Sequence, residues 1–263
     1  MATFRELHFA DTPLLLPNAW DLGSALAFAD AGFAAIGTTS FGVAASAGRP
    51  DGDGSGQAAT AVLAAQLCRL PVYVTVDIED GYSNDPAEVA EFVAELAELG
   101  VAGVNMEDSV AGHLVDAAAF ADKVAAVKRR APGVFINARV DNFWFDEQAT
   151  VDAVLLRARA YADAGADGIF VPGVAEAEDI RGITAGTPLP VNVLAHPTLT
   201  VAQLAELGVR RVSSGSLPYR AAVDAALNSV VALRDGRQPP AATPYWQMQG
   251  RLAAFSRGTA GRP

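Results

Sequence analysis

The sequence predicts an α/β fold, a (β/α)8 TIM barrel followed by one additional C-terminal helix. Short apolar runs typical of buried strands alternate with segments of helical periodicity over most of the 263 residues. Eight strands alternating with eight helices imply parallel pairing and right-handed crossovers, and closure into one barrel suits a chain of this length. A weak repeat of helix end, Gly and apolar strand supports this: AGFAAI (31–36), LGVAGV (99–104), AGADGI (164–169) and LGVRRV (207–212).

A doubly wound open sheet is the alternative to the barrel. Its nucleotide-binding forms carry a Gly-rich loop after a strand, either G-x-G-x-x-G or G-x-x-x-x-G-K-[ST]. The sequence has neither motif in that place. The barrel is therefore the preferred interpretation.

The strands are predicted where an apolar run ends at a Pro, a Gly or a polar residue. The first, PLLL, ends at Pro17, and the third runs from Pro71 into Asp77. In chain order the predicted strands are 13–16, 33–38, 71–77, 101–106, 133–138, 166–171, 190–194 and 209–213.

The helices are predicted from apolar spacing together with caps and breakers. Asp21 can cap the first helix, Pro86 begins the third, and Gly100 ends it. The predicted helices are 21–31, 58–69, 86–99, 117–130, 147–164, 175–184, 200–207 and 218–234. Residues 1–235 then form a barrel domain, and residues 236–263 form an extension with a helix at 245–255.

Composition excludes several classes of partner. The net charge of −11 and the pI near 4.7 disfavour nucleic acid and anionic membranes. No apolar run reaches the length of about 18 residues that a spanning helix needs, and the N-terminus lacks the pattern of a signal peptide. The single cysteine, Cys68, precludes an internal disulfide and fits a reducing cytosol. We therefore expect a soluble cytoplasmic protein.

The stretch VTVDIEDGY (74–82) is the first candidate for a functional site. It is a buried strand that ends in acids, and strand alternation predicts Asp77 and Glu79 on the same side. Two such carboxylates repel each other unless a cation or a proton lies between them. Mg²⁺ prefers hard oxygen ligands, so these residues indicate a magnesium site, with a solvated acidic loop as the alternative.

Polar residues also end the neighbouring strands, and the C-terminal ends of barrel strands meet at one rim. Each residue alone has an ordinary structural explanation, such as a cap or a salt bridge. Together they match a hydrated Mg²⁺ and an arginine clamp for an anionic substrate. The set is Ser40, Asp51, Asp77, Glu79, Glu107, Asp108, Asn137, Arg139, Asp141 and His196.

These motifs, taken in order, resemble the isocitrate lyase/phosphoenolpyruvate mutase superfamily. The resemblance spans Leu16 to Arg220 and rests on LPNAWD (16–21), TTSFGVAASAGRPDG (38–52), VDIEDGY (76–82), GVNMED (103–108), NARVD (137–141) and SLPYRAA (216–222). It implies a (β/α)8 barrel that binds Mg²⁺, with Mn²⁺ as the alternative ion, and a 2-oxo acid or its enolate. It also implies breaking or making a C–C or P–C bond. Members are commonly tetramers that exchange a helix, so a homo-oligomer, dimer or tetramer, is expected.

The resemblance also implies roles for individual residues. Asp77 is similar to the direct metal ligand, and the ligands expected to act through water are Asp51, Glu79 and Glu107. Arg139 matches the arginine that holds the substrate oxygens. Ser40, with the backbone N–H groups of Phe41 and Gly42, matches the cradle for the substrate carboxylate. His196 stands where many lyases have Asn and is expected to bind substrate. The implied catalytic residues are Arg139, His196 and Glu107.

Two departures from the superfamily pattern bear on activity. The lyases carry a Lys-(Lys/Arg)-Cys-Gly-His loop whose cysteine is the acid/base, whereas this chain has Ser-Val-Ala-Gly-His at 109–113. The mutase and phosphonopyruvate hydrolase have a lysine and an asparagine there. Phe41 stands where relatives usually have Gly, and its ring is expected to reshape the site.

The expected function is a Mg²⁺-dependent lyase of a small 2-oxo acid, cleaving or decarboxylating an oxaloacetate-like substrate through an enolate. Decarboxylation asks least of the altered loop, because CO₂ leaves without a proton. Cleavage of isocitrate or 2-methylisocitrate instead leaves a succinate fragment that must be protonated, and the loop lacks the cysteine that does this in the lyases. We therefore expect negligible isocitrate and 2-methylisocitrate lyase activity. The alternatives are a P–C bond enzyme, similar to phosphoenolpyruvate mutase or phosphonopyruvate hydrolase, and a non-catalytic barrel that binds 2-oxo acids.

Overall fold

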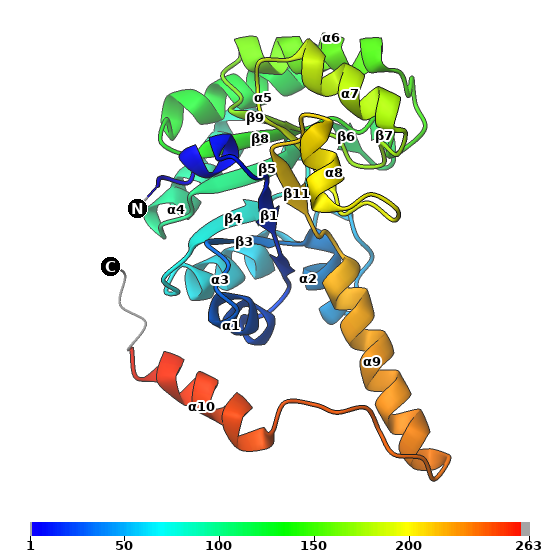
Figure 1. Cartoon of the computed structure of the whole chain (residues 1–263). Helices are drawn as coiled ribbons and strands as arrows, with labels where there is room; N and C mark the ends of the chain where they lie inside the picture. The colour runs from blue at the N-terminus through cyan, green and yellow to red at the C-terminus, as the bar shows by residue number, and fades with distance from the viewer. Residues whose placement is uncertain (1, 259–263) are drawn as a thin grey trace.

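Parallel strands form a nearly closed barrel in the computed structural model, which describes residues 2–258 (Figure 1). All pairings in the main sheet are parallel. Around the sheet the strands are β1 (Leu14–Leu16), β11 (Arg211–Ser213), β10 (Val191–Leu194), β9 (Gly168–Phe170), β8 (Phe135–Arg139), β5 (Gly103–Glu107), β4 (Tyr73–Asp77), β3 (Ala35–Thr38) and β2 (Asn18–Ala19). The predicted (β/α)8 barrel is confirmed.

The ring closes through the first strand of the chain, which Pro17 divides into two pieces. β1 pairs with β11, and β2 pairs with β3. Proline has no N–H for a sheet ladder, which explains the interruption. Its carbonyl still accepts a hydrogen bond from the N–H of Gly37 at 2.9 Å. β1 therefore corresponds to the strand predicted at 13–16, and β2 is an additional short strand after Pro17.

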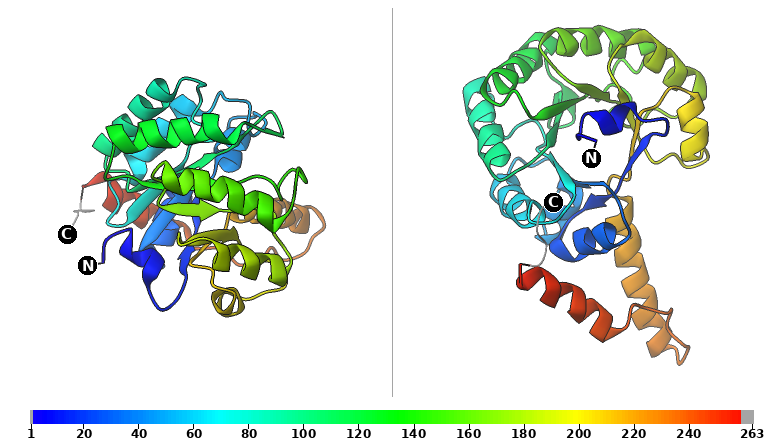
Figure 2. Two further views of the ribbon diagram at one scale, coloured as in Figure 1. Left: turned by 90° about the horizontal axis from the view of Figure 1, so that it is seen from above. Right: turned by 60° about the vertical axis from the view of Figure 1, so that its left-hand side comes forward.

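The helices surround the barrel, as the right-hand view of Figure 2 shows. They are α1 (Leu22–Asp30), α3 (Gln57–Leu67), α4 (Pro86–Glu98), α5 (Ala117–Arg130), α6 (Val151–Asp163), α7 (Ala177–Gly186) and α8 (Val201–Glu206), whereas α9 (Leu217–Arg234) begins after β11 and leads away from the barrel. Their apolar faces and the strands form one large core, in which Val76, Val104, Ile136 and Ile169 are fully buried.

The sequence did not predict several short elements. A helix, α2 (Ser40–Ser46), begins directly after β3, and the strands β6 (Ser109–Val110) and β7 (His113–Leu114) form an antiparallel hairpin after β5. Both lie at the C-terminal ends of barrel strands. At the opposite end, the 3₁₀ helix η1 (Glu6–Phe9) lies across the barrel opening (Figure 2), where the His8 ring stacks on Phe135 at 4.2 Å.

The last two helices extend beyond the barrel wall. α9 projects away from the barrel, and the chain returns through α10 (Tyr245–Ser256), whose predicted position is confirmed (Figure 1). α10 contacts the barrel through an ion pair of Arg251 with Asp30 at 2.7 Å and through Arg69 lying over the Phe255 ring. The division at residue 235 stays a prediction. No helix within residues 2–258 is long and apolar enough to cross a membrane.

Candidate active site

Two adjoining cavities, of about 660 Å³ and about 100 Å³, open at the C-terminal ends of the strands. Ser40, Asp51, Arg139 and Trp144 line both of them. This is the end at which barrels of this kind carry their sites. The cavities bring together six of the ten residues predicted for the rim, namely Ser40, Asp51, Asp77, Glu79, Glu107 and Arg139, whereas Asp108, Asn137, Asp141 and His196 line neither cavity.

Asp77 is the last residue of β4 and lines the smaller cavity. Its carboxylate accepts a hydrogen bond from the N–H of Ser40 at 3.3 Å, and its own N–H donates to Thr38 Oγ1 at 2.9 Å. The first contact ties the Asp77 side chain to the start of α2, and the second ties the end of β4 to β3.

Glu79 reaches the larger cavity by a different route from the one predicted. The strand ends at Asp77, and Glu79 has a left-handed backbone with φ of 50°, so strand alternation does not orient it. Its carboxylate accepts a hydrogen bond from the N–H of Gly54 at 3.3 Å, in the loop that also carries Asp51. Asp77 lines the smaller cavity and Glu79 the larger one, and the turn after β4, not strand alternation, places Glu79.

Glu107 and Arg139 are partners across neighbouring strands. They are paired in register between β5 and β8, and Arg139 Nη1 lies 2.7 Å from Glu107 Oε2. Arg139 Nε donates to Asp141 Oδ1 at 2.6 Å. Within residues 2–258 the Nη2 group makes no hydrogen bond, so one edge of the guanidinium is available to a ligand.

The acids of the cavities are crowded enough to resist ionisation. Burial and the nearby Asp77 raise the pKa of Asp51, and the same two causes raise the pKa of Glu79 to about 7. Burial raises the pKa of Glu107 well above its ordinary value, although Arg139 opposes the shift. The negative charge here exceeds what one arginine can balance, so the site favours a bound cation.

The carboxylates around the cavities are potential ligands of a metal ion. No group of three His, Cys, Asp or Glu side chains among residues 2–258 is arranged to hold a metal ion by itself. Mg²⁺ usually keeps several waters and needs only one or two protein carboxylates. Carboxylates are its preferred ligands, so the cavities fit a hydrated Mg²⁺ with few direct contacts.

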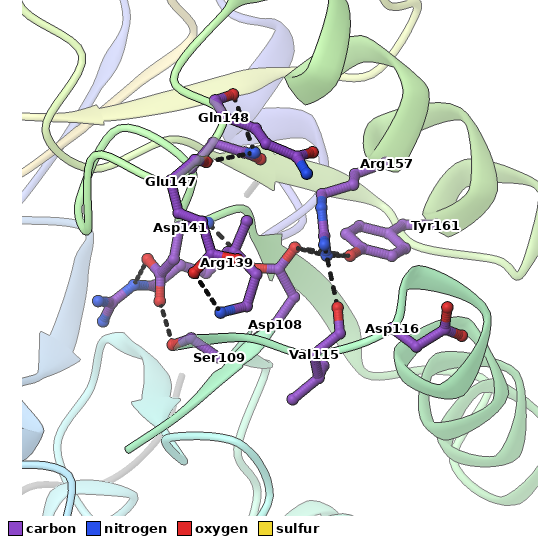
Figure 3. A network of polar contacts seen from close by, with 12 residues as sticks. Asp108, Ser109, Val115, Asp116, Arg139, Asp141, Glu147, Gln148, Arg157 and Tyr161 are labelled. Atoms are coloured by element: carbon purple, nitrogen blue, oxygen red, sulfur yellow. Dashed lines mark hydrogen bonds and ion pairs between the residues drawn. The ribbon is translucent and has the colours of Figure 1, made fainter. Parts of the chain in front are cut away.

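A buried polar network supports the arginine (Figure 3). Asp141 also accepts a hydrogen bond from Ser109 Oγ at 2.6 Å, and its N–H donates to Asp108 Oδ1 at 2.9 Å. Asp108 is fully buried and accepts from Arg157 Nη1 at 2.9 Å and Tyr161 OH at 2.6 Å. Asp108 therefore braces the loop after β8 and does not reach the rim.

Sequence reasoning missed Arg157 and Tyr161, which lie on α6. Their spacing of four residues places both on one helix face, and this was the available signal. It also missed Trp144, whose ring lies 5.6 Å from the Arg139 guanidinium, because nothing in the loop sequence marks an aromatic residue for the site.

The predicted carboxylate cradle is the first turn of α2. Gly42 is required there, since a Cβ atom would lie 2.7 Å from Trp20 Cβ. Two of its three N–H groups already have acceptors, because Ser40 donates to Asp77 and Gly42 to Thr39 Oγ1 at 3.5 Å. Phe41 lines the smaller cavity, and its ring contacts Tyr219 edge to face.

His196 is not brought to the cavities. The strand β10 ends at Leu194, and the His196 ring is held by its own loop: Nδ1 accepts from the N–H groups of Thr198 and Leu199, while Nε2 contacts the Ala175 carbonyl at 2.9 Å. It lines neither cavity. Its predicted role in substrate binding and catalysis therefore finds no support in this geometry, because the ring caps the turn before α8.

The fold and the cavities together define a (β/α)8 barrel protein with an acidic site at the C-terminal ends of its strands. The sequence profile of the phosphoenolpyruvate phosphomutase family matches residues 4–234, and the chain belongs to that family. This confirms the resemblance to the isocitrate lyase/phosphoenolpyruvate mutase superfamily.

Several proteins are similar to this chain. An uncharacterized protein of Mycobacterium tuberculosis (strain H37Rv) is 48% identical, with 98% of each chain covered. The 2-methylisocitrate lyase of Bacillus subtilis (strain 168) is 34% identical over 72% of this chain and 64% of its own length. A protein of Burkholderia cenocepacia J2315 with a crystal structure, provisionally described as a phosphonomutase, is 44% identical to this chain. The two structures align with a TM-score of 0.81, and the alignment covers 87% of this chain and 97% of that chain.

Proposed function

We propose that the chain is a Mg²⁺-dependent lyase that breaks a C–C bond of a small 2-oxo acid through an enolate, by cleavage or by decarboxylation. The observation that carries this proposal is the excess of carboxylates around a single arginine, with the pKa of Asp51, Glu79 and Glu107 raised by burial and crowding. Such an arrangement suits a cation and an anionic ligand bound together.

The residues proposed for the metal are four of the acids that line the cavities. Asp77 would be the direct ligand, and the residues acting through water would be Asp51, Glu79 and Glu107. Mg²⁺, with Mn²⁺ as the alternative, supplies a Lewis acid that withdraws charge from the oxygens of a 2-oxo acid. The metal site and the catalytic role of Glu107 are thus one proposal, and one set of variants tests both.

The substrate carboxylate is assigned to Arg139 and to the first turn of α2, residues 40–42. Glu107 and Asp141 hold the guanidinium from two sides, so its free edge has a fixed direction. A fixed cation stabilises an enolate oxygen better than a mobile one, because no reorganisation is needed as the charge develops. Arg139 is the proposed electrostatic catalyst.

The loop after β5 restricts the chemistry. It contains neither Cys nor Lys, and Ser109 is tied to Asp141. His113 is 85% exposed and lies 3.7 Å from Glu147, away from the cavities. A fragment that leaves as a neutral molecule, such as CO₂ or a carbonyl compound, needs no proton from this loop. The proposal therefore favours decarboxylation or aldol-type cleavage over release of a succinate-like carbanion.

A P–C bond enzyme is the second candidate, and its support is the 44% identity with the provisionally described phosphonomutase. A phosphonate carries up to two negative charges and is usually bound by several cations. Arg139 is the only cationic side chain that lines the cavities within residues 2–258. The C–C reaction therefore ranks first.

The test is a substrate panel with Mg²⁺ that follows pyruvate, glyoxylate and phosphate together. Oxaloacetate probes C–C cleavage because its second carboxylate leaves as CO₂. Phosphonopyruvate probes P–C cleavage, and isocitrate and 2-methylisocitrate probe the reaction that needs the missing cysteine. Pyruvate formation abolished by EDTA and restored by Mg²⁺ supports the first candidate, whereas phosphate release favours the second. Binding without turnover on any 2-oxo acid would favour the non-catalytic barrel.

We also propose that the chain is a homo-oligomer, a dimer or tetramer, joined through α9 and α10. Large apolar side chains are exposed on α9, at Val223, Leu227, Val230 and Leu233, and on α10, at Trp246. An apolar face of this extent on a projecting helix favours burial against another chain. Light scattering after size exclusion measures the mass, and Leu227→Glu with Val230→Glu should reduce it.

A further inference from the structure

Among residues 2–258, one cationic side chain lines the cavities and is available to a substrate. Arg139 is already shared by two carboxylates, Glu107 at 2.7 Å and Asp141 at 2.6 Å. The acidic residues that line the cavities are Asp51, Asp53, Asp77, Glu79, Asp80 and Glu107. Arg139 and a bound cation can hold one carboxylate of a substrate. A second carboxylate would have no cationic partner among the lining residues, and desolvating an unpaired charge is unfavourable.

Part of the lining, here called the apolar wall, consists of large hydrophobic side chains. Four large apolar side chains line the cavities and are nevertheless well exposed: Phe41 at 36%, Val110 at 44%, Trp144 at 50% and Phe145 at 36%. They come from three separate segments, which are α2, the β6–β7 hairpin and the loop after β8. Apolar side chains that gather around a concave site are typical of contact with an apolar part of a ligand.

Apolar residues continue into the smaller cavity. Phe170, Pro172 and Leu194 line it together with Phe41 and Trp144. Around Arg139 the cavities therefore combine charged residues with a group of apolar side chains. A ligand that contacts both has a charged head and an apolar tail.

We propose that the preferred substrate is a 2-oxo acid with a single carboxylate and an uncharged apolar group at its far end. This inference rests on the proposed function and narrows its substrate class. With a hydroxyl on C4, the C3–C4 bond breaks, its electron pair stays on C3, and the fragments are an aldehyde and the enolate of pyruvate. The hydroxyl proton is lost to a site carboxylate or water and C3 gains a proton, so no co-reactant is consumed. The aldehyde leaves neutral, as the loop without Cys or Lys requires.

The binding experiment uses 2-oxo acids that differ only in the tail and have no hydroxyl to cleave. Intrinsic tryptophan fluorescence, to which Trp144 contributes, or calorimetry, with Mg²⁺ present, gives the affinity for 2-oxobutanoate, 2-oxoglutarate and 2-oxo-5-methylhexanoate. Contact of the branched tail with the apolar wall should make 2-oxo-5-methylhexanoate bind about tenfold more tightly than 2-oxobutanoate. 2-Oxoglutarate should bind more weakly than 2-oxobutanoate, because its second carboxylate is unpaired.

A charge substitution tests the wall directly. Val110→Lys places a cation at the cavity mouth on an exposed hairpin position and should reverse the order, so that 2-oxoglutarate binds better than 2-oxo-5-methylhexanoate. Leu156→Lys is the matched control, because Leu156 is exposed on α6 and lines neither cavity. The control should keep the wild-type order.

Turnover supplies the second measurement. 4-Hydroxy-2-oxo-5-methylhexanoate should yield pyruvate and 2-methylpropanal faster than 4-hydroxy-2-oxoglutarate yields pyruvate and glyoxylate. Equal or stronger binding of 2-oxoglutarate by the wild type, or an unchanged order in Val110→Lys, overturns the inference while leaving the proposed function standing. Failure of every 2-oxo acid, 2-oxobutanoate included, to bind overturns both. A wild type that binds the three 2-oxo acids equally well, with no preference for the apolar tail, also overturns the inference.

Discussion

Tyr161→Phe tests whether Asp108 is a charged anchor beneath the candidate site. The substitution removes one hydroxyl, which donates to Asp108 Oδ2 at 2.6 Å in a fully buried environment. A hydrogen bond to a charged group contributes about 1.5–3 kcal/mol, so the free energy of unfolding should fall by about 2 kcal/mol. Asp108 keeps the hydrogen bonds from Arg157 and from the N–H of Asp141, and these prevent a larger loss.

Tyr73→Phe is the matched control. The Tyr73 hydroxyl donates to the neutral carbonyl of Ala2 at 3.0 Å; Tyr73 is the first residue of β4 and so lies at the other end of the barrel. Loss of a neutral hydrogen bond lowers the free energy of unfolding by about 1 kcal/mol or less. Urea denaturation monitored by circular dichroism compares the two variants under identical conditions.

The two variants should also differ in ligand binding. Asp108 holds the N–H of Asp141, and Asp141 in turn orients Arg139. Tyr161→Phe should therefore weaken binding of 2-oxo acids several-fold, and Tyr73→Phe should leave it unchanged. Equal stability losses in the two variants would show that Asp108 is protonated and makes only neutral hydrogen bonds, which would refute the anchoring role.

Three further predictions follow from the same contacts. Asp77→Ala should abolish Mg²⁺-dependent ligand binding measured by calorimetry. Asp80→Ala should largely keep the binding but lower stability, because Asp80 pairs with the buried Lys123 at 3.3 Å. Equal losses of binding in the two variants would contradict the assignment. The pKa of Glu79 is raised to about 7, so between about pH 4.5 and 7 the unfolded state has lost a proton that the folded state keeps. Thermal stability without metal should therefore fall as the pH rises through this window, and added Mg²⁺ should reduce the fall. Differential scanning calorimetry measures both effects. Thiol-blocking reagents should leave the activity unchanged, because Cys68 is buried at the end of α3. The rate of isocitrate cleavage should be roughly 10²-fold or more below the rate with the best substrate. Inactivation traced to Cys68 would show that the loop has been misinterpreted.

The barrel could be predicted because its pattern is redundant. Each predicted strand is a short apolar run, each helix has a cap or a glycine end, and β4 and α4 were placed within about two residues. The first strand is the exception, since Pro17 divides it and its two halves pair with different neighbours. Periodicity describes a strand and does not reveal which partners it has.

The short elements at the rim were not predictable in the same way. α2 has seven residues, and the strands of the β6–β7 hairpin have two each, so neither is long enough to show a period. His196 failed for a related reason. Its position at a strand end suggested the rim, whereas the local N–H groups of Thr198 and Leu199 hold the ring in the loop. Local hydrogen bonds compete with a functional position and leave no trace in spacing.

The barrel interior adds a charge that the strand pattern does not disclose. Arg210 and Arg211 are adjacent, and alternation sends one outward and one inward; in the structure Arg210 is exposed and Arg211 is fully buried. Arg211 donates to Ser213 Oγ and Asn105 Oδ1, both at 3.1 Å, and burial lowers its pKa to about 9. Ser213 and Asn105 line the smaller cavity, so the floor of the candidate site rests on this guanidinium. The charge of Arg211 is attracted by Asp77 from beneath the site, where it offsets part of the negative potential without occupying the space that a metal ion and a substrate need.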